Sequence, residues 1–171
     1  NAFPFFTGKV FTEDRKIQEI PFYYYDAMKF LKNDKQIFRI FLMPVQYFAV
    51  FGWGKINANP EILFDRGLVV RHPGSSETKN NKIALSAYKY LLMKDYLNFE
   101  NLLKILNVKY VIQRNDFDWL YYNNISQSPD VVADVLSKYK KIKTFGKLDL
   151  YLINENYLLP QIYAPTVLSY V

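Results

Sequence analysis

The chain has 171 residues, of which 50% are hydrophobic, 18% aromatic and 22% charged, so it can bury a sizeable core as one compact domain and is not intrinsically disordered as a whole. Its 22 Lys and Arg residues against 16 Asp and Glu residues give a net charge of +6, which favours anionic partners without requiring one. With no cysteine and one histidine, the chain cannot form a disulfide, a thiolate metal site, a cysteine nucleophile or a multi-histidine zinc site of its own.

The first segment, residues 1–19, mixes phenylalanines with a charged run and shows neither helical nor strand periodicity. We expect an aromatic lead-in arm there, followed by a single domain over residues 20–171. The longest uncharged stretch, residues 40–54, is interrupted by Pro44 and is shorter than the roughly 20 apolar residues of a spanning helix. Because the chain begins at Asn1 without a signal-peptide pattern, we interpret it as a piece of a longer protein.

A helix and a strand are predicted next. The apolar residues Tyr24, Met28 and Leu31 recur at spacings of four and three, which predicts a helix over residues 22–32. Pro21 stands where a first helical turn tolerates a missing amide. Residues 36–43 are rich in Ile, Phe and Leu on both alternating faces, which is typical of a strand covered on both sides.

The middle of the chain has an irregular pattern between residues 44 and 73. Trp53 lies between two glycines, and the short apolar run 68–70 is a further strand candidate. Residues 73–81 are polar and turn-forming, so we expect an exposed and mobile loop.

The next elements are better defined. Apolar spacing predicts one helix over 83–94 and a second over 99–106. Asn107 is suited to the left-handed turn that closes a helix, and residues 108–113 (VKYVIQ) have the β-branched and aromatic content of a strand.

The last third of the chain begins with a loop or short irregular helix over 115–124. Ser128 and Pro129 form a cap and first-turn pair for a helix whose apolar positions are Val131, Val132, Val135, Leu136 and Tyr139. Two strand candidates, residues 141–145 and 148–153, are separated only by Gly146 and Lys147. A two-residue connection of this kind is typical of a tight β-hairpin.

This order of elements predicts an α/β (α+β) fold. We expect a single domain with a mixed β-sheet of about four or five strands, helices packed on the sheet and a C-terminal β-hairpin. The chain shows neither an internal repeat nor a second domain.

Catalytic motifs are sparse in this sequence. It contains no phosphate-binding glycine loop and no nucleophile elbow around a serine. His72 could act as a general base, but an isolated histidine beside a polar loop is more often a solvated or capping residue. We therefore expect no catalytic residue and no cofactor in this chain.

Carboxylates and exposed rings give a candidate binding site. Asp116 and Asp118 follow a predicted strand, where paired carboxylates can bind a cation or serve as acid and base, although the same spacing is ordinary in turns. Aromatic rings in irregular segments can stack on a sugar, whereas the alternative is that they fill the core. The candidate carbohydrate-binding residues are Tyr47, Trp53, Asp116, Asp118, Trp119 and Tyr122.

A lysine cluster near the C-terminal hairpin comprises Lys138, Lys140, Lys141 and Lys143. Nucleic-acid binding would need basic and aromatic residues interleaved on one surface, and no known DNA or RNA motif is present. A solvated lysine face explains the cluster better, and nucleic acid is not an expected partner.

Five stretches of the chain form a recognisable order: FPFFTGKVF (3–11), IPFYYYDAMKFL (20–31), FRIFLMP (38–44), LLKILNVKYVI (102–112) and LDLYLINENYLLPQIYA (148–164). Together they resemble the extracytoplasmic domain that follows the membrane helices of GT-C-type glycosyltransferase-like proteins, including the YfhO-like and arabinofuranosyltransferase-like families.

The resemblance implies a parent enzyme that transfers a sugar from a polyprenyl-phosphate donor to a cell-envelope glycan or glycoprotein outside the membrane. In such families the catalytic carboxylate lies in an early loop between membrane helices, and that region is absent here. The domain is therefore expected to bind acceptor glycan or to act as a scaffold, without catalysis, at the extracytoplasmic face of the cell membrane. Its expected partners are the transmembrane part of the same polypeptide and a cell-envelope glycan or lipid-linked sugar.

Two other interpretations remain open from the residues alone. One is a structural or protein-interaction module of a cell-surface assembly. The other is a self-contained enzyme that acts on an anionic substrate.

Overall fold

A computed structural model of the chain describes residues 20–46, 49–58, 63–71, 79–118, 128–153 and 158. The expected arm over 1–19 lies outside these residues. The helices are α2 (Phe22–Asn33), α3 (Lys79–Leu92), α4 (Tyr96–Ile105) and α5 (Pro129–Leu136). The strands are β1 (Arg39–Gln46), β2 (Ala49–Phe51), β3 (Gly54–Ala58), β4 (Gly67–Arg71), β5 (Val108–Arg114), β6 (Lys140–Phe145) and β7 (Leu148–Leu152).

The main sheet has five strands in the order β4-β1-β5-β7-β6. β1 is parallel to both β4 and β5, whereas β7 is antiparallel to β5 and to β6. β2 and β3 form a separate antiparallel pair. The predicted α+β fold, with one mixed sheet and a C-terminal hairpin, is therefore confirmed.

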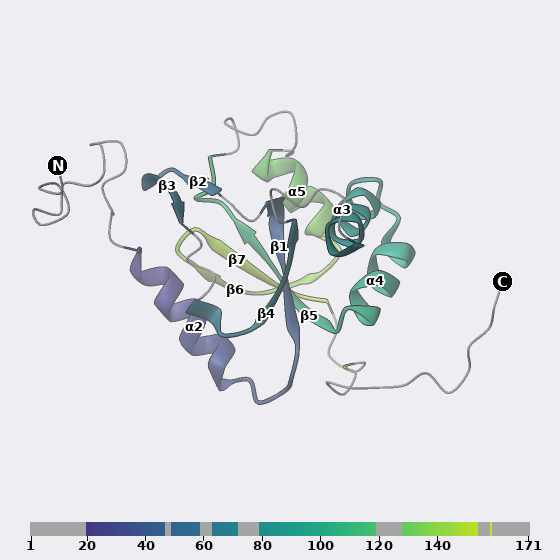
Figure 1. Ribbon diagram of the computed structural model, residues 1–171, viewed down its shortest axis with the longest axis horizontal. Helices are drawn as coiled ribbons and strands as arrows, with labels where there is room; N and C mark the ends of the chain where they lie inside the picture. Colours follow the sequence, from purple (N-terminus) through teal and green to yellow (C-terminus); the bar gives the residue numbers. More distant parts are fainter. Residues whose placement is uncertain are drawn as a thin grey trace, which may run out of the picture.

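Helices cover both faces of this sheet. Figure 1 shows α2 on one side and α3, α4 and α5 on the other, and α2 contacts β6 and β7 while α4 and α5 contact β5. None of the helices in the described ranges is both long and apolar enough to cross a bilayer.

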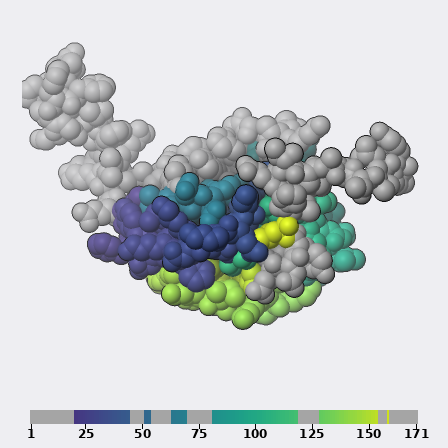
Figure 2. All heavy atoms as spheres, turned by 90° about the horizontal axis from the view of Figure 1, so that it is seen from below, coloured from purple at the N-terminus to yellow at the C-terminus, as the bar shows by residue number. Residues whose placement is uncertain are grey.

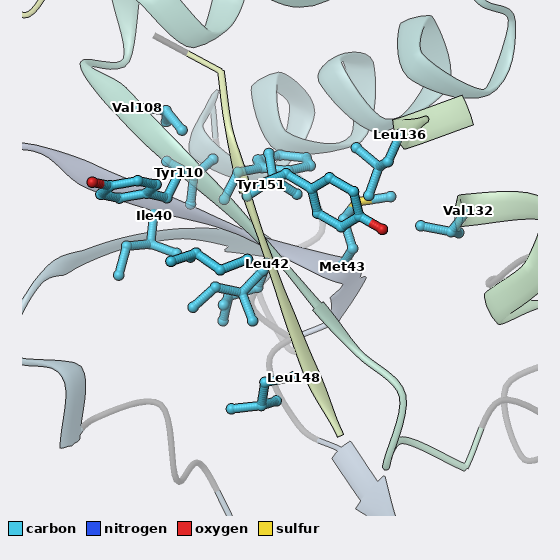
Figure 3. Close-up of a cluster of buried hydrophobic side chains, with 14 of the residues drawn as sticks. Ile40, Leu42, Met43, Val108, Tyr110, Val132, Leu136, Leu148 and Tyr151 are labelled. Carbon is cyan, nitrogen blue, oxygen red and sulfur yellow. The ribbon is translucent and has the colours of Figure 1, made fainter. Parts of the chain in front are cut away.

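The core lies on both faces of the central strands because every residue of β5 is buried. Four consecutive β1 residues, Ile40 to Met43, are also at most 1% exposed, as the run of apolar residues predicted. Figure 3 shows Ile40, Leu42, Val108 and Tyr110 gathered around the crossing of these strands, with side chains from α5 and β7 beside them.

Helix ends follow the local sequence closely. α2 begins directly after Pro21, and Asp34 follows its last residue as the C-cap. The Ser128 hydroxyl accepts a hydrogen bond from the Val131 amide at the start of α5, and Asn107 takes a φ of 57° after α4. Val131 itself is 43% exposed, so its place in the predicted apolar stripe was wrong.

The structure differs from the sequence prediction in the middle of the chain. The segment that looked irregular contains the β2–β3 hairpin as well as β4, which includes the predicted strand at 68–70. α3 already begins at Lys79, so the predicted loop over 73–81 was too long. α4 begins earlier than expected because the Asp95 carboxylate accepts a hydrogen bond from the Asn98 amide and caps the helix.

The β6–β7 hairpin is tied to the end of β5 by one buried carboxylate. Asp149 accepts hydrogen bonds from Asn115 at 3.0 Å and from Thr144, and it pairs with Lys141 at 3.1 Å. Burial alone would raise the pKa of Asp149, but these hydrogen bonds together hold its pKa below the ordinary value of 3.8. The carboxylate is thus ionised in the folded protein and fixes the hairpin to the sheet.

Gly146 lies in the hairpin turn with a φ of 52°. A Cβ built there would come within 2.6 Å of the Tyr23 ring, so α2 packs directly on this turn. Only glycine fits this position without strain, because L residues are disfavoured at positive φ and the ring occupies the space that a side chain would need.

Gly146→Ala is therefore expected to lower the free energy of unfolding by about 2–4 kcal/mol, from the left-handed backbone and the steric clash together. Gly52→Ala is the matched control, since a Cβ at Gly52 meets nothing nearer than the Asp116 carbonyl oxygen at 3.7 Å. Urea denaturation of the two variants measures the difference. Equal losses in both would contradict the packing of Tyr23 on the turn.

Candidate functional site

The candidate site lies at the edge of the sheet where β1 and β5 have their carboxyl ends. Asp116 follows the last residue of β5 by two positions. Because α2 runs back along the sheet, its first turn reaches the same edge with Tyr23 and Tyr24. The turn of the β2–β3 hairpin adds Trp53 from a third segment.

One carboxylate oxygen joins these three segments. Asp116 Oδ2 accepts hydrogen bonds from the Tyr23 hydroxyl at 2.7 Å, the Tyr24 hydroxyl at 3.0 Å and the Trp53 indole Nε1 at 2.7 Å. Hydrogen bonds to an ionised acceptor are about twice as strong as those between neutral groups. We call Asp116, Tyr23, Tyr24 and Trp53 the Asp116 cluster.

The backbone holds the same segments together. The Gly52 amide donates to the Asp116 carbonyl oxygen at 2.8 Å, and Phe51 and Phe117 form an antiparallel bridge. The hairpin is thus attached to the chain just after β5 by main-chain and side-chain bonds at the same place.

Aromatic packing fixes the orientation of the Trp53 ring. It stacks on Phe51 with ring centroids 4.8 Å apart and an interplanar angle of 22°. Tyr24 meets Phe51 edge-on at 6.3 Å and stacks on Phe64 at 6.1 Å. Phe51 and Phe64 are at most 2% exposed, whereas Trp53 is only partly buried. The indole therefore has a fixed plane at a position that solvent still reaches.

Burial governs the electrostatics of the cluster. Asp116 is 7% exposed, and within the described residues its Oδ1 atom is buried without a hydrogen-bond partner. Burial of the Tyr23 phenol, then its hydrogen bond to Asp116 and the negative charge of that carboxylate, raise the pKa of Tyr23 far above its ordinary value of 10.0. Tyr23 therefore remains a hydrogen-bond donor well into the alkaline range.

The structure brings two of the site residues predicted from the sequence together and does not describe three others. Trp53 and Asp116 are in direct contact, and Asp118 is half-buried two residues further on. Tyr47, Trp119, Tyr122 and His72 lie outside the described residues. In the described part of the chain, no group of three or more His, Asp or Glu side chains could hold a metal ion.

Tyr23 and Tyr24 are members of the site that the sequence pattern did not indicate. The periodicity of α2 predicts Tyr24 only as part of an apolar stripe, because a buried tyrosine ring and a buried apolar residue give the same helical periodicity. The signal that could have found them is the run of three tyrosines at the start of the helix, because a buried tyrosine hydroxyl needs a hydrogen-bond partner.

Two lysines of the predicted cluster form ion pairs, and a third lies over an aromatic ring. Lys138 pairs with Glu100 at 2.9 Å and Lys141 with Asp149 at 3.1 Å. Lys143 instead lies 4.9 Å from the centre of the Phe145 ring, and Lys140 is exposed. Three of the four lysines thus contact other residues of the fold.

Asp116→Asn is expected to lower the free energy of unfolding by about 2–4 kcal/mol, because three donors lose a charged acceptor and face an amide that is itself a donor on one side. Asp118→Asn is the matched control, because it makes the same change of carboxylate to amide two residues after Asp116. Chemical denaturation near neutral pH measures both, and a larger loss in the control would contradict the central role of the Asp116 carboxylate.

The pH dependence of stability tests the Tyr23 bond separately. A tyrosine whose pKa is higher in the folded state contributes fully below its unfolded pKa of about 10 and loses that contribution as the pH rises toward the folded pKa. The unfolding free energy of the parent chain should therefore fall more steeply above pH 10 than that of Tyr23→Phe. Tyr25→Phe, which removes the hydroxyl of an exposed tyrosine on the same helix, is the control. Parallel curves for Tyr23→Phe and the parent would contradict the raised pKa.

Comparison with known proteins found one matching family and several solved structures of similar fold. The family model described as "Alpha-(1->3)-arabinofuranosyltransferase, N-terminal GT-C domain" matches residues 1–165. None of the curated protein sequences matches the chain.

Two solved structures of arabinofuranosyltransferase AftD from Mycobacteria have the same fold. The first, a cryo-EM structure, has a TM-score of 0.65 at 18% identity and covers 81% of this chain but 12% of that chain. The second is the structure of a mutant of AftD, labelled class 2. It has a TM-score of 0.65 at 19% identity, and the match covers 81% of this chain and 13% of that chain. The present chain thus spans about an eighth of the length of these relatives.

The resemblance to GT-C-type glycosyltransferases that the sequence carries is confirmed by the family match over nearly its whole length. The chain belongs to the family of alpha-(1->3)-arabinofuranosyltransferases defined by their N-terminal GT-C domain.

Proposed function

We propose that this domain is the extracytoplasmic, non-catalytic part of a membrane-embedded arabinofuranosyltransferase-like protein, and that it binds the acceptor glycan at the edge that carries the Asp116 cluster. The acceptor is an oligosaccharide of the class that such an enzyme extends, and the sugar donor is bound and used by the transmembrane part of the same polypeptide.

The observation that carries the proposal is the setting of Trp53. Its indole N–H is bonded to Asp116 at 2.7 Å, one face stacks on Phe51, and the side chain is only partly buried. A ring held in a fixed plane at the surface loses little entropy when a sugar stacks on it, because it is already ordered before binding.

The state of Asp116 supports a binding role rather than catalysis. A general acid or base must reach a proton of the substrate, whereas Asp116 is 7% exposed and its Oδ2 already accepts three hydrogen bonds. This carboxylate holds the tryptophan and the tyrosines in place.

A purely structural role is the second candidate, and the connectivity of the same cluster favours it. The Asp116 carboxylate joins α2, the β2–β3 hairpin and the end of β5, which is the bracing that a scaffold for the membrane part would need. In that case the fixed tryptophan serves packing alone.

NMR titration of the chain with arabinofuranosyl oligosaccharides distinguishes the two candidates. The parent chain should show saturable shifts, Trp53→Ala should bind at least about 10-fold more weakly, and Trp53→Phe should stay within about 3-fold, because phenylalanine retains a stacking face. Trp119→Ala is the companion variant for the other tryptophan.

The Trp53→Phe variant separates binding from stability. It loses the hydrogen bond to Asp116 just as Trp53→Ala does, so both variants should be destabilised, but only the alanine variant should lose sugar affinity. The absence of shifts in the parent chain, or equal weakening in both variants, would favour the scaffold.

A further inference from the structure

The outward face of α2 is unusual for a surface helix. Phe22 is 84% and Tyr25 37% exposed, and their ring centroids lie 6.5 Å apart. Lys29 and Lys32 follow on the exposed side of the same helix. Residues three and four apart are neighbours on a helix, so the two rings and the two lysines form one continuous strip.

The edge strand β6 extends this strip with further positive charge. α2 packs against β6 through Phe30, whose ring centroid is 5.5 Å from that of Phe145. Lys143 lies 5.7 Å from the centre of the Phe30 ring, and Lys140 is exposed on the same strand. Figure 2 shows the atoms of α2 directly beside those of the β6–β7 hairpin. We call Phe22, Tyr25, Lys29, Lys32, Lys140 and Lys143 the basic-aromatic face.

The lysines of this face form no ion pair with another residue that the structure describes. Among the described residues, none of its four lysines has a carboxylate within ion-pair distance, in contrast to Lys109, Lys138 and Lys141. The acidic residue within α2 is Asp26. An excess of unpaired lysines on one side of the molecule creates a local positive potential, which attracts anionic surfaces.

We propose that the basic-aromatic face lies on the surface of an anionic phospholipid bilayer. Lysine side chains reach lipid phosphates while their apolar stems stay near the acyl boundary, and exposed aromatic rings partition to the headgroup level. A face of point-charge lysines without arginine suits a diffuse headgroup layer better than the bidentate recognition of single phosphates in a nucleic acid.

This inference goes beyond the proposed function because it uses the outer side of α2, whereas the Asp116 cluster uses Tyr23 and Tyr24 on its inner side. Sugar binding and bilayer binding are measured with different ligands and different variants, so each can fail without the other.

Co-sedimentation with lipid vesicles tests the proposal on the whole chain. The parent should bind phosphatidylcholine vesicles that contain about 30% phosphatidylglycerol at least about 10-fold more tightly than pure phosphatidylcholine vesicles. Raising the salt from about 0.05 M to about 0.5 M should remove most of that difference, because screening shortens the reach of the charges.

Two charge-reversal variants locate the contact. Lys29→Glu combined with Lys140→Glu should weaken binding to the anionic vesicles by at least about 10-fold, since each lysine near such a surface contributes about fivefold. Lys82→Glu combined with Lys89→Glu changes the net charge equally but alters exposed residues of α3 on the other side of the sheet, and it should retain most of the binding. Circular dichroism verifies that both variants are folded.

A third variant tests the rings. Phe22→Ala should weaken binding to anionic vesicles about fivefold without loss of stability, because the side chain is 84% exposed. Equal binding by the two charge-reversal variants, no preference for anionic vesicles, or tighter binding to a single-stranded oligonucleotide than to the vesicles would each overturn the proposal.

Discussion

The carboxylate of Asp116 is the interaction on which the arrangement of this domain most depends. A single oxygen accepts hydrogen bonds from two tyrosines of α2 and from the tryptophan of the β2–β3 hairpin, so three segments far apart in the sequence are fixed at one point. Because Asp116 is nearly buried, its negative charge is stabilised mainly by these donors, and losing them would leave a desolvated charge.

A second carboxylate holds the other end of α2. Asp34, the residue that ends the helix, accepts hydrogen bonds from Lys109 and from the Tyr110 hydroxyl, both on β5. Burial alone would raise the pKa of Asp34, but these hydrogen bonds keep it below its ordinary value. α2 is thus attached to the sheet at both ends, which keeps the Asp116 cluster on its inner side and the basic-aromatic face on its outer side in a fixed relation.

Much of the fold was predictable because it follows from local rules. The helix after Pro21, the Ser128 cap, the left-handed Asn107 and the turn at Gly146 each depend on a few adjacent residues. The β2–β3 hairpin was missed because its short strands are stabilised by Phe117 and Asp116, more than 50 residues away, and carry little periodicity of their own.

The sequence by itself determined most of the elements of the main sheet and its helices, and it indicated a glycosyltransferase family, because periodicity, turn chemistry and family resemblance are all properties of linear order. It also identified Trp53 and Asp116 as candidates from their residue types. Only the tertiary structure decided that these two side chains touch, that Tyr23 and Tyr24 complete the site, and that α2 packs against the β6–β7 hairpin. These relations join residues from 63 to more than 100 positions apart, and their geometry is set by how the helix packs on the sheet, which no local pattern encodes.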